Sequence, residues 1–147
     1  MGLPSERRLA KTDYFLILRV LTDMVERLQA TGRKSMYQYM DADKATKHLY
    51  TLDHVFIVDE AYLVAYDFAT PWYVRDTDIF LEELLVARLA VSGDFTVVPA
   101  FLERKAREAG AVLAVAGTAL AKADNALASL YHRAGFSTQA LTLVKET

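Results

Sequence analysis

The side chains best suited to chemistry in this sequence are carboxylates, which gather in its middle part. Eight acidic residues there are accompanied by a single arginine, Arg75. They are Asp53, Asp59, Glu60, Asp67, Asp76, Asp78, Glu82 and Glu83. This concentration of charge produces a field that attracts a cationic amine, but acids in hairpin turns and on solvated strand edges give the same pattern.

Other catalytic and metal-binding side chains are scarce. The chain has no cysteine, which excludes thiol nucleophiles, thiolate metal sites and disulfides. His48 stands without a second ligand beside it, so we expect a partly buried surface histidine and no metal site.

Composition indicates one globular domain. The 147 residues are 53% hydrophobic and 24% charged, which suits a packed core. The longest weakly polar run, Ala109 to Ala121, is shorter than the roughly 20 residues that span a bilayer, and residues 1–11 lack the apolar core of a signal peptide. A net charge of -2 gives no reason to expect nucleic acid. We therefore expect a soluble, cytoplasmic protein.

The N-terminal part predicts a short strand followed by two helices. The strand covers Arg8 to Lys11, and a helix that Thr12 or Asp13 caps then ends at Gly32. Its apolar residues recur with the helical period: Tyr14, Leu18, Leu21, Val25 and Leu28. Met36 to Tyr50 indicates a weaker second helix.

The next segments favour strands. β-branched and aromatic residues at Val55 to Val58 and at Tyr62 to Phe68 flank Asp59 and Glu60, which is typical of an antiparallel hairpin. Ile79 to Leu89 has the local propensity of a helix, and a third strand is the competing interpretation.

A helix and a short strand come next. Thr96 as N-cap places Pro99 in the first turn, where its missing N–H is tolerated, and Gly110 ends the helix. Val112 to Ala116 is a short apolar strand.

The segment Asp124 to Phe136 predicts the last helix. Its apolar residues lie on one helical face, Asp124 is a good N-cap, and Gly135 can adopt the left-handed conformation that closes a helix. Phe136 to Val144 then has the length and apolar content of a strand.

This order of elements resembles that of the GNAT acyl-coenzyme A N-acyltransferases over nearly the whole chain. Leu81 to Val86 is similar to the family's fourth strand. The residues that resemble its last motif are Asn125, Tyr131, Gly135 and Phe136. The compact size and the phrase TPWYVRDTDIFLEELLVARL look like small GNAT-like proteins encoded by bacteriophages. The resemblance implies an α+β fold, with a mixed central sheet flanked by helices, a single acyltransferase-like domain over residues 1–147, and a strand at Ile79 to Leu89.

The resemblance also implies a donor and a set of site residues. Members of the family transfer an acetyl group from acetyl-CoA to a primary amine, with the pantetheine arm between strands four and five and the pyrophosphate at the start of helix three. Glu82 or Glu83 is then the carboxylate that removes a proton, and Tyr131 the acid that protonates the leaving thiolate. Only one glutamate can face the cleft, because neighbouring strand residues point to opposite faces. The residues implied to bind the cofactor are Leu85, Val86, Gly93, Thr96 and Asn125.

The loop from Ala90 to Thr96 departs from the family's Gln/Arg-x-x-Gly-x-Gly/Ala pattern. It keeps one glycine and places Asp94 where an anion should bind, and Pro99 in the helix that follows has no N–H. We therefore expect acetyl-CoA to bind weakly or in an altered way.

The implied site residues also have structural interpretations. Tyr131 lies where the end of a helix needs an apolar partner for Phe136. A solvent-facing Glu82 or Glu83 would discourage sheet aggregation, and Asn125 would help to cap its helix.

Two functions remain open at this point. The first is an acetyl-CoA-dependent N-acetyltransferase acting on a primary amine of a small molecule or a protein. The second is a phage protein on a GNAT-like fold that has lost its cofactor and modulates a host protein in the host cytoplasm. Trp72 and Tyr73 either line an acceptor pocket or cover the core. A homodimer formed through the terminal strands or the second helix is compatible with both functions.

Overall fold

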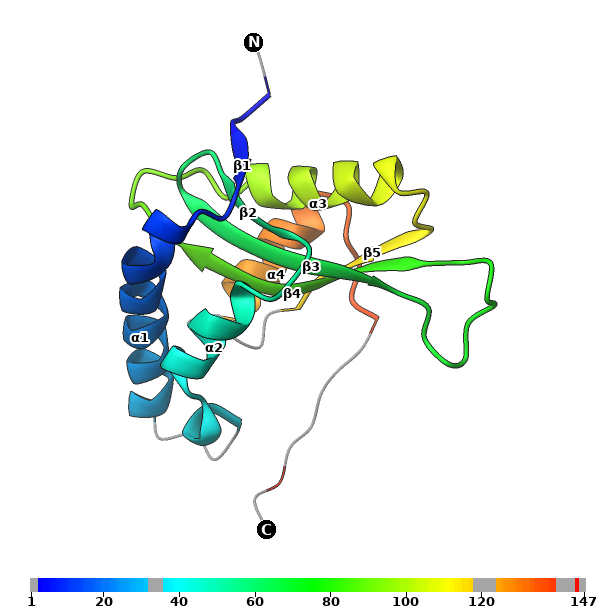
Figure 1. Ribbon diagram of the computed structural model, residues 1–147. Helices are drawn as coiled ribbons and strands as arrows, with labels where there is room; N and C mark the ends of the chain where they lie inside the picture. The colour runs from blue at the N-terminus through cyan, green and yellow to red at the C-terminus, as the bar shows by residue number, and fades with distance from the viewer. Residues whose placement is uncertain (1–2, 32–35, 118–123, 140–144, 146–147) are drawn as a thin grey trace.

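Five strands form a sheet whose two faces are covered by different helices (Figure 1). The computed structural model describes residues 3–31, 36–117, 124–139 and 145. The strands are β1 (Glu6–Arg8), β2 (Val55–Val58), β3 (Tyr62–Ala69), β4 (Phe80–Arg88) and β5 (Leu113–Val115). The helices are α1 (Tyr14–Ala30), α2 (Ala42–Leu49), α3 (Val97–Glu108) and α4 (Asp124–Arg133), with short 3-10 helices at Lys11–Asp13 and Met36–Tyr39.

The sheet is mixed. Strands β1 to β4 lie in sequence order and pair antiparallel, whereas β5 joins β4 in parallel after the crossover through α3. Helices α1 and α2 cover one face and α3 and α4 the other, as Figure 1 shows. The predicted α+β class, with a mixed central sheet in a single domain, is confirmed.

Each face of the sheet has its own apolar core. The core under α1 and α2 includes Ile17, Leu21, Leu28, Leu49, Ile57, Leu63 and Leu85. The core under α3 and α4 includes Val64, Tyr66, Leu81, Phe101, Leu102 and Tyr131. Since neighbouring strand residues point to opposite faces, the hairpin β2–β3 contributes to both cores and is buried on both sides.

The strand prediction for Ile79 to Leu89 is confirmed by β4, although its leucines and glutamates suit a helix. Strand β3 pairs along the whole of β4, so tertiary hydrogen bonding overrides local propensity.

Three predicted boundaries are corrected. The first strand is Glu6–Arg8, earlier than Arg8 to Lys11, because these residues are the ones that pair with β2. The single helix expected from Met36 to Tyr50 is interrupted at Asp41, whose carboxylate accepts a hydrogen bond from Lys44 N and begins α2 as its N-cap. The expected stop of α1 at Gly32 lies outside the described residues, and α1 ends at Ala30.

Glycines end the last two helices as predicted. Gly110 (φ 72°) and Gly135 (φ 95°) both adopt the left-handed conformation. After Gly135, Phe136 N donates to Tyr131 O at 3.0 Å, and the two rings pack 5.1 Å apart. The closing strand predicted from Phe136 is not present at residues 136–139, and residues 140–144 lie outside the described part.

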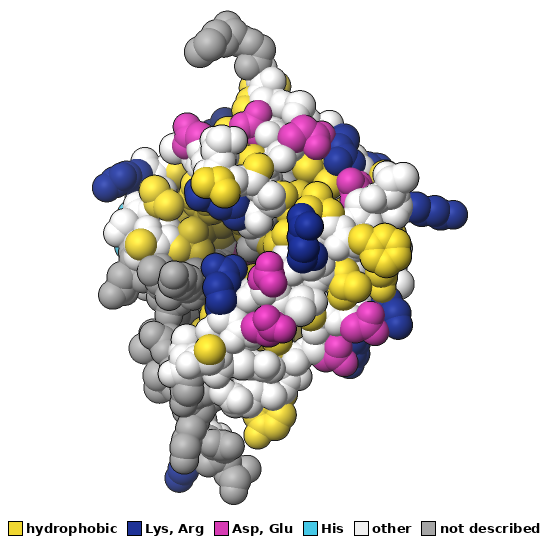
Figure 2. Space-filling view, turned by 90° about the vertical axis from the view of Figure 1, so that its left-hand side faces the viewer, with side chains coloured by type: hydrophobic (Ala, Val, Ile, Leu, Met, Phe, Trp, Pro, Cys, Tyr) yellow, Lys and Arg dark blue, Asp and Glu magenta, His cyan; other side chains and the backbone are white. Residues whose placement is uncertain are grey.

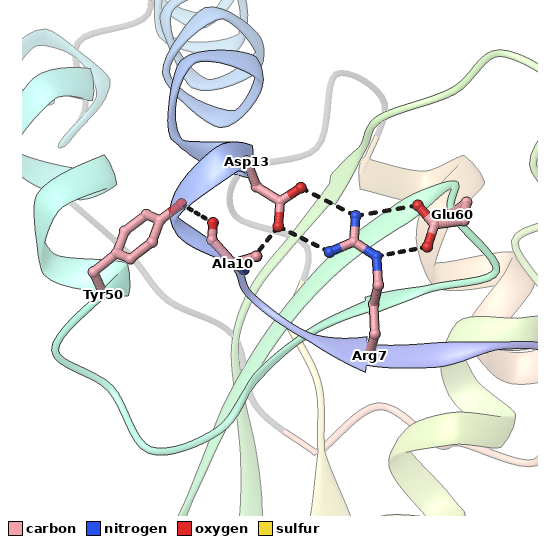
Figure 3. A network of polar contacts seen from close by, with 5 residues as sticks. All are labelled: Arg7, Ala10, Asp13, Tyr50 and Glu60. Carbon is pink, nitrogen blue, oxygen red and sulfur yellow. Dashed lines mark hydrogen bonds and ion pairs between the residues drawn. The ribbon is translucent and has the colours of Figure 1, made fainter.

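Arg7 connects β1 to two other parts of the chain (Figure 3). Its guanidinium donates to both carboxylate oxygens of Asp13, at 2.9 and 3.0 Å, and to Glu60 Oε1 at 2.6 Å in the β2–β3 turn. Asp13 also accepts from Ala10 N, while Tyr50 donates to Ala10 O. Asp13 was expected to cap α1, but its side chain makes no such bond because it is engaged by Arg7 and Ala10.

Candidate active site between β4 and α4

A β-bulge in β4 determines which of its side chains share a face. Ala65 pairs with Leu85, whereas the next residue of β3, Tyr66, pairs with Glu83, so Leu84 is an extra residue without a partner. Leu85 therefore points into the core under α1 and α2, whereas Glu83 lies on the face covered by α3 and α4.

The two candidate glutamates are separated by this geometry. Glu83 shares a face with its cross-strand neighbour Tyr66, which belongs to the core under α3 and α4. Glu82 pairs with the exposed Asp67 and lies on the opposite face. Val86, on the same face as Glu83 but beyond the bulge, packs partly buried against that core.

Strands β4 and β5 stay together for only part of their length. Their parallel pairing runs from Phe80 and Leu113 to Glu82 and Val115. From Glu83 to Arg88, β4 has no strand partner on that side in the described part of the chain. Within the described residues, β4 and β5 therefore diverge beyond Glu82.

Glu83 lies at the point where the strands diverge. Its carboxylate Oε2 accepts a hydrogen bond from Gly117 N, just beyond β5, at 3.2 Å. Burial raises the pKa of the Glu83 carboxyl to about 7, although the bond from Gly117 acts in the opposite direction. A carboxyl with this pKa exchanges protons near neutral pH, which suits a general base.

Tyr131 faces the same region from α4. Its side chain is 4% exposed, and its hydroxyl has no hydrogen-bond partner among the described residues. Burial and then the charge of Glu83 raise the pKa of Tyr131. Buried hydroxyls are normally hydrogen-bonded, so the unpaired hydroxyl of Tyr131 is unusual and makes this residue a candidate for the site.

The ring of Tyr131 is held by two phenylalanines. It packs edge-on against Phe95 at 5.4 Å and against Phe136 at 5.1 Å. Tyr131 therefore has the packing role considered for it, through its ring. Its hydroxyl takes no part in that packing and is unpaired among the described residues.

Gly93 is required by packing. A Cβ at this position would lie 2.7 Å from Ala61 Cβ and 2.8 Å from a ring carbon of Tyr62. The carbonyl oxygen of Gly93 accepts hydrogen bonds from Tyr62 Oη at 3.0 Å and from Arg88 at 3.4 Å. These packing contacts are enough to require glycine at position 93, so the glycine is not by itself evidence for a phosphate site.

The N-terminus of α3 is occupied by the protein itself. Asp94 Oδ1 accepts from Thr96 N at 3.0 Å and from Thr96 Oγ1 at 2.9 Å, which also lowers the pKa of Asp94. Val97 N and Val98 N donate to carbonyl groups of the loop, and Pro99, the third residue of α3, has no N–H. The capping group is thus Asp94, and the side chain of Thr96, expected to be the cap, makes no capping bond.

A hollow of about 500 Å³ lies between α1 and the end of β4. It is lined by Val20, Asp23, Glu26, Arg27, Ala30 and Arg88. Figure 2, which looks onto the side of α1, shows a hollowed face with basic and acidic side chains around hydrophobic ones. Five of these residues lie on α1 at helical spacing, but only the tertiary structure brings Arg88 beside them, so the sequence did not predict this hollow.

The remaining candidates lie elsewhere or stay undetermined. Asn125 belongs to the first turn of α4. Trp72 and Tyr73 are 94% and 71% exposed, so neither covers the core, and they pack edge-on at 5.4 Å in the β3–β4 loop.

His48 is exposed rather than partly buried. Among the described residues no group of histidine and acidic side chains could hold a metal ion, and no described helix is long and apolar enough to cross a membrane.

Comparisons of sequence and of structure give different results. No family model and no curated protein matches the sequence. The structure is similar to a possible acetyltransferase from Clostridium difficile 630, with 16% identity over 99% of this chain and 98% of that one and a TM-score of 0.64. A predicted acetyltransferase from Clostridium acetobutylicum, solved with acetyl-CoA, shares 16% identity over 98% and 96% of the two chains, with a TM-score of 0.59. An aminoglycoside acetyltransferase from an uncultured soil metagenomic sample shares 14% identity over 100% and 99%, with a TM-score of 0.57. The GNAT-like fold is therefore confirmed, and identities this low show the fold alone.

Proposed function

We propose that this protein is an N-acyltransferase that moves an acetyl group from the thioester of acetyl-CoA to a primary amine. The observation that carries the proposal is the unpaired buried hydroxyl of Tyr131, on the same side of the sheet as the Glu83 carboxyl, whose pKa is about 7 and whose charge acts on that hydroxyl. A scaffold of this kind supports many functions, so this pair of side chains supports the assignment more than the fold does.

In this mechanism Glu83 acts as the base. Its carboxylate takes a proton from the ammonium group of the acceptor, directly or through a water molecule, and leaves a neutral amine. The amine nitrogen then forms a bond to the thioester carbonyl carbon, loses its excess proton to solvent, and the carbon–sulfur bond breaks. Acid and base groups placed in this way contribute about 10²–10⁴-fold to the rate, and holding the two substrates together contributes more.

Tyr131 stabilises the leaving sulfur. A phenol whose pKa is raised by burial stays neutral, so it can donate a hydrogen bond to the thiolate as negative charge develops there. A thiol has a pKa of about 8.5, well below that of this phenol, so full proton transfer from Tyr131 is unfavourable. Tyr131 therefore acts as a hydrogen-bond donor, and a proton reaches the sulfur from solvent.

The binding residues are proposed by their positions. Leu85 and Val86 lie where β4 has no second strand partner among the described residues, which suits the amide groups of a pantetheine arm. Asn125 in the first turn of α4 is a further candidate. At Gly93 and Thr96 the diphosphate does not fit, because the N–H of Thr96 is bonded to Asp94 and Gly93 is tied into protein packing.

The acceptor is proposed to be cationic. The acidic middle part of the chain attracts amines, and a structural neighbour is an aminoglycoside acetyltransferase, an enzyme named for polyamine substrates. The described acids are partly neutralised, since Glu60 binds Arg7 and Asp78 binds Arg75. Charge alone does not select one class of amine, so the proposed acceptor is a primary amine of a small molecule or a protein.

Asp94 favours a second candidate function. Its contact with the start of α3 removes the donors that hold a diphosphate in GNAT-like folds, as expected of a protein that has lost its cofactor. Such a protein, phage-encoded as its sequence resemblance suggests, would use the scaffold to bind and modulate a host protein.

Calorimetry with acetyl-CoA and an acetyl-transfer assay against a panel of primary amines separate the two functions. The acyltransferase proposal expects donor binding and thiol release that Glu83→Gln abolishes while donor binding remains. If acetyl-CoA neither binds at millimolar concentration nor is consumed, the protein has the second function.

A further inference from the structure

The nucleotide end of the candidate donor site is closed by the protein's own atoms. Asp94 Oδ1 takes both the N–H and the hydroxyl of Thr96. Val97 N and Val98 N are bonded within the loop, and Pro99 replaces the next donor. The first turn of α3 therefore already holds an anion, which is a carboxylate of the same chain.

The ring of Phe95 reinforces this closure. It occupies the position where the family pattern has a small residue, and it packs edge-on against Tyr62 at 5.8 Å and against Tyr131 at 5.4 Å. The loop is thus anchored to the catalytic tyrosine and to the start of β3. It cannot open toward a ligand without breaking these aromatic contacts.

The neighbouring arginines do not replace the lost donors. Arg88 is engaged with Tyr62 Oη at 3.0 Å and lies over that ring. Arg27 lines the hollow together with the carboxylates of Asp23 and Glu26, so the guanidinium groups there are opposed by equal negative charge. A diphosphate gains little from such a surface.

The Glu83 end of the site, in contrast, keeps its polar groups. Glu83 lies where the described strands β4 and β5 diverge, and the hydroxyl of Tyr131 lacks a partner among the described residues. We propose that this protein recognises its acyl donor through the pantetheine thioester alone, and that Asp94 is the residue that removes selectivity for the nucleotide. The donor class is then acyl thioesters of pantetheine, with or without the adenosine and diphosphate of coenzyme A. This inference rests on the proposed acyl transfer.

Calorimetry with acetyl-CoA and with S-acetylpantetheine, which lacks both phosphate and nucleotide, tests the inference. We expect dissociation constants within about threefold of each other for the wild type. Two or three charge-assisted hydrogen bonds at a helix N-terminus would instead favour acetyl-CoA by about 100-fold.

Asp94→Asn is the informative variant, because the amide oxygen keeps the bond from Thr96 N while the negative charge is removed. It should bind acetyl-CoA about tenfold more tightly and S-acetylpantetheine unchanged. Arg27→Gln, in the same hollow as Arg88, is the matched control and should leave both affinities unchanged.

Three results would overturn the inference. The first is a wild type that prefers acetyl-CoA by tenfold or more. The second is an Asp94→Asn variant with unaltered affinity for acetyl-CoA, and the third is an Arg27→Gln variant that loses affinity for acetyl-CoA only. In each of these cases the proposed acyl transfer stands. Binding of neither thioester at millimolar concentration would overturn the acyl transfer and the donor preference together.

Discussion

The carboxylate of Glu83 on β4 raises the pKa of the Tyr131 hydroxyl on α4, after the larger effect of burial. The carboxyl belongs to β4 and the hydroxyl to α4, and both lie on the side of the sheet that α3 and α4 cover. Burial and the charge of Glu83 both favour the neutral form of Tyr131, so a carboxyl that titrates near neutral pH and a neutral phenol are present together.

Acyl transfer should depend on pH through Glu83. The carboxylate form is the active base, so kcat/KM should rise with pH and level off above an apparent pKa of about 7. Glu83→Gln should lower kcat/KM by about 10²–10⁴-fold and remove this inflection. Glu82→Gln is the matched control on the opposite face and should leave both unchanged; a loss of activity in that variant would assign the base to Glu82 instead.

Glu83 should also make the fold less stable as the pH rises from acid to neutral. Its folded pKa is about 7, above the unfolded value of about 4.3, so folding disfavours its ionised form. Wild-type stability should therefore fall relative to Glu83→Gln as the pH rises from about 4 to 7, and the two should agree below that range. Urea unfolding at several pH values measures the difference, and an equal pH dependence of the two proteins would contradict it.

Tyr131→Phe should distinguish the catalytic role of the hydroxyl from the packing role of the ring. The hydroxyl has no partner among the described residues, so its removal should change the free energy of unfolding by less than about 1 kcal/mol. Turnover should fall by about 10²-fold at unchanged donor affinity, because the lost bond forms only as charge develops on sulfur. Steady-state kinetics and chemical unfolding of the same variant check both statements. If turnover is unaltered, Tyr131 serves packing alone.

The ion pair of Asp13 with Arg7 should make the protein less stable in acid. The hydrogen bond from Arg7 is the main cause of its lowered pKa, so its contribution is present above the unfolded pKa and is lost as the pH falls through the folded value. Asp13→Asn should cost about 1–3 kcal/mol at neutral pH, and its gap from the wild type should close in acid. The exposed Glu60 provides the comparison: Glu60→Gln should cost less stability than Asp13→Asn, because solvent screens its ion pair with Arg7. A larger loss in Glu60→Gln than in Asp13→Asn would contradict this assignment.

Gly93→Ala should destabilise the protein by about 1–3 kcal/mol, since its Cβ would overlap Ala61 Cβ and the ring of Tyr62. Adding Ala61→Gly removes one of the overlapping atoms and should restore part of the stability. Thermal unfolding of the single and double variants measures this coupling. Full stability of the single variant would show that the loop can move away from β3.

Local patterns predicted several elements well. The hairpin around Asp59 and Glu60, the stops at Gly110 and Gly135, and Pro99 in the first turn of α3 all depend on neighbouring residues, so a short stretch of sequence contains the needed information. The break at Asp41 was missed because a capping aspartate inside a helical pattern resembles a solvated surface residue.

The candidate site was predicted only in outline. Simple alternation in β4 showed that Glu82 and Glu83 lie on opposite faces but could not say which one faces α4, because that depends on packing across the sheet. Alternation also fails beyond Leu84, where the bulge reverses the faces of the residues that follow. The reason for Gly93 likewise depends on contacts with Ala61 and Tyr62, which are distant in the chain.

The sequence by itself thus determined the order of helices and strands and the kinds of side chain available for chemistry, since both follow from composition and local periodicity. The tertiary structure alone decided that Glu83, rather than Glu82, lies on the side of the sheet where α4 places Tyr131. Register, bulges and the face on which a strand residue lies arise from pairing between residues far apart in the chain, and the chemistry of the site depends on them.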